Sequence, residues 1–329
     1  MAIHVLEYIR DPSGVWSLPA EQLERLRREF PEVKFESPAS REEVAAHLSG
    51  ADVVFGWAVR PDNFHLARRL RWIHVSAAGV GAALFPTLIA SDVVFTNGRG
   101  LHATAMAEHT LGVMLSFARK LHLARDAQHE RRWIQDQLLE HGPPFGELSG
   151  STLGLVGFGR VGTAIATRAR SLGMEVIAVR RHPVSPPDPA HHQWGSDRLG
   201  ELLGRADWVV LAAALTTETQ NLIGAAQLAR MKPGAVLVNL GRGALVDEAA
   251  LIAALERGSL AGAALDVVEK EPLPAASPLW GMRNVILTPP VSGLGPRYWE
   301  RAVDQFARNL RAFLRGEPLE NVVNKRMGY

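Results

Sequence analysis

The 329-residue sequence contains no cysteine. Disulfide bonds, zinc sites built on thiolates and a catalytic thiol are therefore excluded. No spacing of His, Asp and Glu is typical of a metal site, so we expect no bound metal. An excess of one charge is also missing, because 36 Lys and Arg stand against 34 Asp and Glu. The arginines are scattered among glutamates, which predicts solvated helix surfaces and no nucleic-acid partner.

Long apolar runs are missing as well. No stretch reaches the roughly eighteen apolar residues that a membrane span needs. The opening segment MAIHVLEYIR lacks the basic and apolar parts of a signal peptide. We therefore expect no membrane association and a cytoplasmic location. The chain is long enough for two domains with full cores.

Short apolar runs alternate with amphipathic segments along most of the chain. Because strand and helix alternate, we predict the α/β class, with two Rossmann-like doubly wound parallel-sheet domains and a cleft between them. The predicted strands are 2–8, 33–36, 52–57, 71–76, 92–97, 152–157, 174–179, 207–213, 235–240, 261–267 and 284–289, and the helices of the first series are 19–30, 40–50 and 61–70.

Other segments set the domain boundaries. A helical stretch at 102–130 is too long for a simple crossover, and the segment 140–150 is a break rich in Gly and Pro. Residues 181–197 are rich in Pro and His, which predicts a surface loop. An amphipathic helix at 296–316 follows the last strand. We infer a split substrate-binding domain, 1–100 plus 288–329, with a nucleotide-binding domain, 101–287, inserted into it.

The motif GFGRVG stands between an apolar strand and a helix. Gly157 permits a tight turn, Gly159 lets the backbone approach a pyrophosphate, and Gly162 lets helix and strand pack closely. The backbone amides of Arg160 and Val161 then point at the phosphates from the start of a helix. This context predicts a dinucleotide site, which three glycines alone would not.

The end of the next strand indicates which dinucleotide is bound. An acidic residue there would hold the ribose hydroxyls of NAD, but the sequence has Arg180 and Arg181. A guanidinium can bind a 2′-phosphate through two hydrogen bonds. The sequence therefore favours NADP(H), with NAD(H) possible. The alternative is two ordinary surface arginines.

Three longer segments resemble one family. TNGRGLHATAMAEHTLGVML (96–115), LTTETQNLIGAAQLARMKPGAVLVNLGRGALVDEAAL (215–251) and GAALDVVEKEPLP (262–274) are similar, in order, to signatures of the D-isomer-specific 2-hydroxyacid dehydrogenases. That group contains glyoxylate/hydroxypyruvate reductases and phosphoglycerate dehydrogenases. The resemblance implies hydride transfer between a nicotinamide and the carbonyl carbon of a small 2-keto acid.

The resemblance also implies roles for particular residues. Arg242 would bind the substrate carboxylate and polarise its carbonyl, and a cation between two glycines at a strand end suits that task. Glu271 would tune a catalytic histidine, and Asp266 would hold the nicotinamide carboxamide beside the cofactor contacts of Leu240 and Gly241. For Arg242 the alternative is a structural ion pair, for Glu271 an exposed loop carboxylate, and for Asp266 a helix or turn cap.

The segment SAAGVG resembles the family's loop whose backbone amides complete the carboxylate pocket. Ala78, Gly79 and Val80 would lie nearest the substrate. Small residues are also what any tight turn would contain.

The family's catalytic histidine falls on Pro290, within LTPPVSGLG. General acid catalysis contributes about 10²–10⁴-fold, so its loss predicts a slow enzyme. Glu271 through a water, His102 or Tyr298 are alternative proton donors. The protein could instead be a non-catalytic NAD(P)-binding regulatory relative, or the position could have been altered from histidine.

The stretch 103–118 is more apolar than one buried helix face requires. Burial against a second copy would explain this, and members of the family are mostly homodimers. The alternative is a helix buried inside its own domain.

Overall fold

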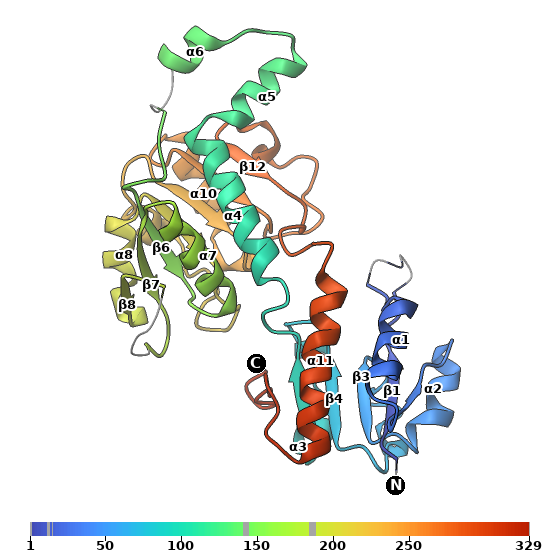
Figure 1. The fold of residues 1–329 in the computed structure, drawn as a ribbon. Helices are drawn as coiled ribbons and strands as arrows, with labels where there is room; N and C mark the ends of the chain where they lie inside the picture. The colour runs from blue at the N-terminus through green and yellow to red at the C-terminus, as the bar shows by residue number, and fades with distance from the viewer. Residues whose placement is uncertain (1, 12–13, 15, 141–144, 184–188, 329) are drawn as a thin grey trace. The chain divides into compact units, whose positions relative to one another are not determined.

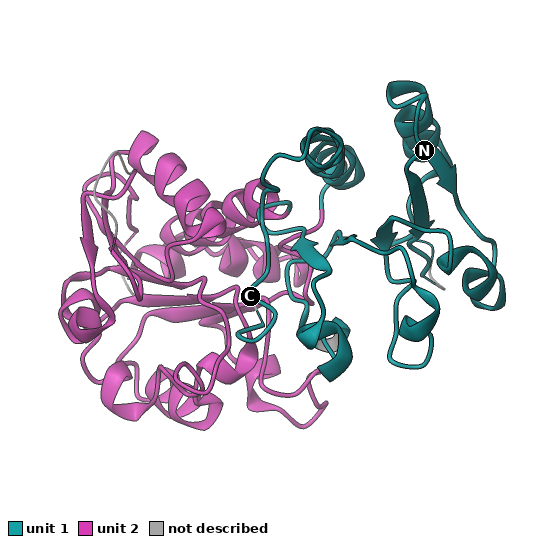
Figure 2. Ribbon diagram, turned by 90° about the horizontal axis from the view of Figure 1, so that it is seen from below, with its two compact units in different colours: residues 1–101, 295–329 teal, residues 102–294 magenta. Residues whose placement is uncertain are grey.

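The computed structural model describes residues 2–328 except 12–13, 15, 141–144 and 184–188. The chain forms two compact units (Figure 2). Unit 1 comprises residues 1–101 and 295–329, and unit 2 comprises residues 102–294. Each unit contains one all-parallel sheet with helices on both faces, so the predicted α/β fold of two parallel-sheet domains is confirmed.

Unit 1 is a five-stranded sheet of order β2-β1-β3-β4-β5 (Figure 1). Alternate residues along each strand pack on opposite faces, against α1 and α11 on one side and α2 and α3 on the other. The elements are β1 (His4–Tyr8), α1 (Ala20–Glu29), β2 (Lys34–Glu36), α2 (Arg41–Leu48), β3 (Val53–Gly56), β4 (Trp72–Val75), α3 (Pro86–Ala90), β5 (Val94–Asn97) and α11 (Tyr298–Arg315).

An aromatic stack joins the C-terminal helix to the unit 1 sheet. Phe306 of α11 lies parallel to Phe55, with ring centroids 4.1 Å apart, and stacks on Trp72 at 5.2 Å. All three side chains are fully buried. Residues far apart in sequence therefore share one core, which explains why the C-terminal segment belongs to unit 1.

His74 lies on β4 within this core. Its side chain is fully buried, Nδ1 is 2.7 Å from Thr96 Oγ1, and Nε2 has no hydrogen-bond partner in the described chain. Burial lowers the pKa of His74 from 6.5 to about 3. The folded state therefore holds the ring neutral, whereas the unfolded chain protonates it near pH 6.5.

We expect this histidine to make the protein sensitive to acid. The contribution of His74 to the free energy of unfolding is fully present above pH 6.5. It falls by up to about 1.4 kcal/mol per pH unit as the pH drops from 6.5 toward 3. Urea unfolding at a series of pH values measures this slope. The variant His74→Asn is uncharged throughout and should show a shallower slope from a lower starting stability. Equal slopes in the two proteins would contradict the prediction.

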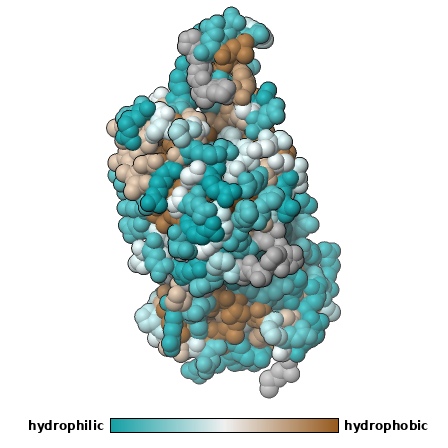
Figure 3. Space-filling view, turned by 90° about the vertical axis from the view of Figure 1, so that its left-hand side faces the viewer, coloured by the Kyte–Doolittle hydropathy of each residue, from teal (hydrophilic) through white to brown (hydrophobic). Residues whose placement is uncertain are grey.

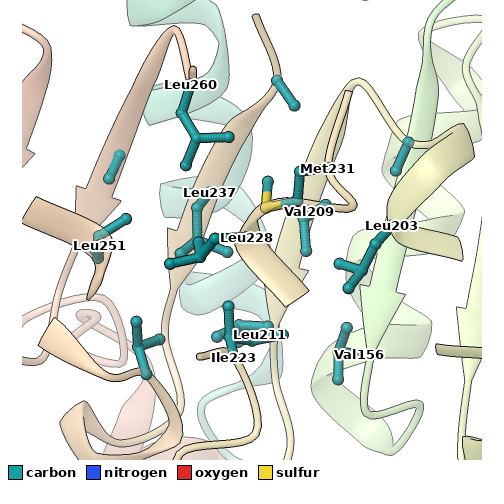
Figure 4. Packing of buried hydrophobic residues seen from close by; sticks show 14 of the residues in the cluster. Val156, Leu203, Val209, Leu211, Ile223, Leu228, Met231, Leu237, Leu251 and Leu260 are labelled. Carbon is teal, nitrogen blue, oxygen red and sulfur yellow. The ribbon is translucent and has the colours of Figure 1, made fainter. Parts of the chain in front are cut away.

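Unit 2 is a seven-stranded sheet of order β12-β11-β10-β9-β6-β7-β8 (Figure 1). Helices α4 and α7 cover one face, and α8, α9 and α10 cover the other, where leucine and valine side chains interdigitate (Figure 4). The elements are α4 (Ala103–Ala118), α5 (Leu121–His129), α6 (Gln135–Glu140), β6 (Thr152–Val156), α7 (Arg160–Ser171), β7 (Glu175–Val179), β8 (His192–Trp194), α8 (Leu199–Arg205), β9 (Trp208–Leu211), α9 (Ala225–Leu228), β10 (Val236–Asn239), α10 (Glu248–Glu256), β11 (Gly262–Leu265) and β12 (Val285–Leu287).

Each predicted strand is present, but one helix prediction was wrong and one helical stretch is divided in two. The segment 61–70 forms only a short 3-10 turn, Phe64–Leu66. There the Asn63 side chain accepts a hydrogen bond from Arg60 N and donates one to Ala58 O, which favours a turn over a helix. The stretch 102–130 is two helices, because Lys120 adopts a left-handed conformation with φ 53°.

The loop prediction for 181–197 was also wrong in part. Residues His192–Trp194 form β8, an edge strand that pairs with β7. The proline-rich positions 184–188 of that segment, and 141–144 of the predicted break, lie outside the described residues. Prolines before a short edge strand do not interrupt the sheet, which is why composition misled the prediction.

Candidate active site

The predicted cofactor and substrate residues of unit 2 follow the strands of its parallel sheet. Since all seven strands run the same way, the loops that leave them emerge at one edge. The chain reverses direction across the sheet between β6 and β9, which is the place where ligands bind in sheets of this kind.

The glycine turn after β6 has the geometry that a dinucleotide requires. Gly157 adopts φ +94°, and a Cβ there would lie 2.5 Å from the backbone nitrogen of Ala213. A Cβ on Gly162 would lie 2.6 Å from the Gly157 carbonyl oxygen. A Cβ on Gly159 would meet nothing within 4 Å. This residue is the N-cap of α7, and no side chain there caps the first backbone amides of the helix. The turn therefore leaves both space and backbone amides for a pyrophosphate.

The two arginines after β7 differ in their surroundings. Arg180 is half-buried, and its backbone nitrogen donates to the Trp194 carbonyl. Arg181 is exposed and forms an ion pair with Glu218 at 2.5 Å. Glu218 lies on the loop after β9 and was not predicted as a site residue, because a sequence does not show which loops meet in space.

Arg242 follows β10 in a tightly held turn. The buried side chain of Asn239 accepts from Gly241 N at 3.1 Å and donates to the Arg242 carbonyl at 3.0 Å. A Cβ on Gly241 would lie 2.9 Å from the carbonyl oxygen of Ala213, the residue that also abuts Gly157. The Arg242 turn and the glycine turn thus border the same backbone. Asn239 was missed by sequence reasoning, although a polar residue ending a buried strand is a usable signal.

The Arg242 side chain is exposed and forms no ion pair with any carboxylate of the described chain. Its Nη1 donates to the Gly241 carbonyl at 2.7 Å. The structural ion pair considered as an alternative is therefore absent from the described residues. A guanidinium held at the site edge without a counterion is suited to binding an external carboxylate.

Glu271 lies on a turn beside Arg242. A Cβ on Gly243 would lie 1.9 Å from the Val268 carbonyl oxygen, so the chain after Arg242 runs directly along this turn. Glu271 is exposed, and its Oε1 accepts from Val268 N at 3.3 Å. The structure thus places the carboxylate and the guanidinium on adjoining turns, without an ion pair between them.

Asp266 organises the loop that contains Pro290. Its carboxylate is buried and accepts from Thr288 Oγ1 at 2.7 Å, from Val291 N at 3.1 Å and from Ser292 N at 3.1 Å. Asp266 thus caps the turn that contains Pro290. Pro290 is exposed on this loop, where the family pattern has its histidine.

His102 holds the same loop from another side. Its Nδ1 donates to the Gly293 carbonyl oxygen at 2.9 Å, and a Cβ on Gly293 would lie 2.9 Å from that nitrogen. Only glycine at 293 leaves the imidazole this close to the backbone. The side chain of His102 therefore contacts the main chain of the loop that contains Pro290.

The predicted carboxylate loop lies in unit 1, directly after β4. Ala78 and Gly79 are exposed and Val80 is buried. The Ala78 carbonyl accepts from Asn97 Nδ2 at 2.7 Å, and the Ser76 carbonyl accepts from the Tyr298 hydroxyl at 3.0 Å. Asn97 and Tyr298 thus fix this loop, a function that the sequence did not reveal.

Tyr298 is poorly suited to supply a proton. Its hydroxyl already donates to Ser76, and burial raises the pKa of the tyrosine. Within the described residues there is no group of His, Asp and Glu that could hold a metal ion. The described helices also include none that is long and apolar enough to cross a bilayer.

The strand order and the glycine turn define unit 2 as a dinucleotide-binding domain of the Rossmann class. A family model described as "D-isomer specific 2-hydroxyacid dehydrogenase, NAD binding domain" matches residues 111–292. The chain belongs to the D-isomer-specific 2-hydroxyacid dehydrogenase family, whose members are NAD(P)-dependent oxidoreductases acting on 2-hydroxy acids.

Similar proteins include the glycerate dehydrogenase of Methylorubrum extorquens, 34% identical over 93% of this chain and 97% of that protein. The D-3-phosphoglycerate dehydrogenase of Methanocaldococcus jannaschii is 34% identical over 91% of this chain, which spans only 57% of its length. A solved NADPH-dependent glyoxylate/hydroxypyruvate reductase of Sinorhizobium meliloti, in complex with NADP and sulfate, superposes with a TM-score of 0.78 at 27% identity, covering 99% of this chain and 100% of that one.

Proposed function

We propose that the protein is an NADP(H)-dependent reductase of small 2-keto acids, of the glyoxylate or hydroxypyruvate type, slowed by the proline at 290. The observation that carries the proposal is the position of Arg242. Its guanidinium forms no ion pair in the described chain, and its turn borders the same backbone as the dinucleotide turn. A cation at that edge of the sheet can bind the carboxylate of a substrate that lies next to the nucleotide cofactor.

When bound, the cofactor supplies the hydride. The guanidinium of Arg242 binds the substrate carboxylate and polarises the keto oxygen. Asp266 keeps the 288–292 turn in place, and its Oδ2 accepts only one described hydrogen bond, which leaves capacity for the carboxamide.

The site lacks the family's usual donor of the proton that completes the reaction. Pro290 has no ionisable group, so the proton must come from elsewhere, either from Glu271 through a water or from His102. Positioning of the substrate and cofactor and the charge of Arg242 still contribute to catalysis, because neither depends on a general acid. We therefore expect a measurable but slow enzyme.

The preference for NADP(H) rests on Arg180 and Arg181, which follow β7 where the adenine ribose lies in Rossmann domains. The similarity to a reductase whose structure contains NADP supports it. NAD(H) remains the second cofactor of this proposal, because Arg181 already has an anionic partner in Glu218.

NADPH oxidation with glyoxylate, hydroxypyruvate and phenylpyruvate tests the proposed activity. We expect turnover above the background rate with at least one of these acids. Absence of turnover with all three, while NADPH still binds, would favour the second candidate, a binding-only regulatory relative. The observation that favours this candidate is the lack of an ionisable side chain at 290.

We also propose that the protein is a homodimer. Helix α4 buries its apolar residues largely against α7 of its own unit, so it does not carry this proposal. The segment containing α5 and α6 does, because Trp133 is 89% exposed and helps to line a groove of about 770 Å³, in which Leu121, Ile134 and Leu138 lie beside arginine and glutamine side chains. In this part of unit 2, hydrophobic residues are visible among hydrophilic ones (Figure 3). An apolar surface of this kind fits a second copy.

Light scattering after gel filtration tests the dimer. We expect twice the chain mass for the wild type, and the mass of one chain for Trp133→Glu at the same concentration, because a carboxylate cannot be buried unpaired in an apolar interface. Trp280→Glu is the control, since Trp280 is another exposed tryptophan of unit 2 outside the groove. A wild type of single-chain mass would exclude the dimer.

A further inference from the structure

One ion pair of unit 2 spans the edge of the sheet where the dinucleotide turn lies. Arg181 comes two residues after β7, and Glu218 lies on the loop after β9. Strand β6, which ends at the glycine turn, is hydrogen-bonded to β7 on one side and to β9 on the other. The pair therefore joins two loops that flank the glycine turn.

The loop that carries Glu218 is well ordered by its own hydrogen bonds. The Thr219 hydroxyl donates to the Ala214 carbonyl at 2.8 Å and accepts from Thr216 N at 2.7 Å. At its start, Ala213 lies against Gly157, where a Cβ would be 2.5 Å from the Ala213 nitrogen. The backbone thus fixes Glu218 near the dinucleotide turn, with 70% of its side chain exposed.

We propose that Glu218 is a specificity-determining residue for the cofactor, an inference that rests on the proposed NADP(H)-dependent function. In the free protein the carboxylate of Glu218 forms an ion pair with the guanidinium of Arg181, the group that would bind the 2′-phosphate of NADP. Binding of that phosphate must displace Glu218 and place a second anion beside it. Glu218 therefore weakens binding of NADPH and leaves binding of NADH unaffected, because NADH presents only hydroxyl groups at that position.

The size of the effect follows from the exposure of both side chains. Arg181 and Glu218 are 41% and 70% exposed, so water and salt screen their interaction strongly. We expect Glu218→Gln to tighten NADPH binding by about threefold to tenfold at low salt. The gain should shrink as the salt concentration rises.

Calorimetric titration of NADPH and NADH into the full-length wild type and Glu218→Gln tests the proposal. The matched control is Glu175→Gln, which removes a half-buried glutamate paired with Arg205 at 3.1 Å, at the opposite end of β7. Glu218→Gln should lower the dissociation constant of NADPH alone, and Glu175→Gln should change neither constant. Arg181→Gln should weaken NADPH binding and remove most of the gain when combined with Glu218→Gln.

Two failures can be told apart. If both nucleotides bind but Glu218→Gln leaves the ratio of their dissociation constants unchanged or weakens NADPH binding, the role of Glu218 is wrong and the proposed function stands. If neither nucleotide binds the wild type, the proposed function and this inference both fall.

Discussion

Replacing Pro290 with histidine is expected to raise the turnover number with NADPH and a 2-keto acid by at least about 10²-fold. The variant places an ionisable group on an exposed loop that Asp266 and His102 already hold in position. Arg242 and Glu271 lie on adjoining turns, and on the proposed function the variant supplies the histidine that this site lacks.

The pH profile makes this test specific. The Pro290→His variant should lose activity as the pH rises above the pKa of the new imidazole, near its ordinary value of about 6.5 or higher if Glu271 stabilises the charged ring. The control is Pro289→His, because Pro289 is the neighbouring exposed proline and should give no such gain. An unchanged rate in Pro290→His would favour a binding-only protein.

Replacing Arg242 with glutamine should lower kcat/KM for the keto acid by about 10²–10³-fold, the usual cost of removing one group that stabilises a developing oxyanion. On the proposed mechanism the guanidinium both binds the carboxylate and polarises the keto oxygen, so KM should rise and kcat should fall. The dissociation constant of NADPH should change little, because the glycine turn is untouched. Steady-state kinetics and a nucleotide titration measure these quantities.

Two further variants sharpen the Arg242 test. Arg242→Lys keeps the charge but loses the planar two-pronged geometry, so it should recover only part of the loss. Arg257→Gln removes an exposed arginine next to α10 and should leave the kinetics unchanged. A wild-type kcat/KM in Arg242→Gln would show that another group binds the carboxylate.

The sequence predicted most of the fold because its signals are local. Each buried strand is a short apolar run, and the turn from β6 to α7 is marked by its glycines. The structure departs from the predictions where single residues redirect the backbone. Asn63 bonds its own loop and prevents a helix, and Lys120, buried and left-handed, ends α4 with its ammonium on the Leu138 carbonyl at 2.5 Å.

The sequence suggested which residues belong to the candidate site, but it did not indicate the contacts between them. Resemblance located Arg242, Asp266 and Glu271, since each follows a strand in a long signature. No local pattern indicates that Asp266 would hold the Pro290 loop or that Glu218 would pair with Arg181. Those contacts join loops from different strands, and only the order of strands in the sheet brings them together.

The most direct test of the account is calorimetric titration of the wild-type protein with NADPH and with NADH. We expect one nicotinamide dinucleotide bound per chain, with NADPH the tighter ligand. If neither form of the coenzyme bound, the glycine turn after β6 would not be a cofactor site, and the assignment of a keto-acid reductase would be contradicted.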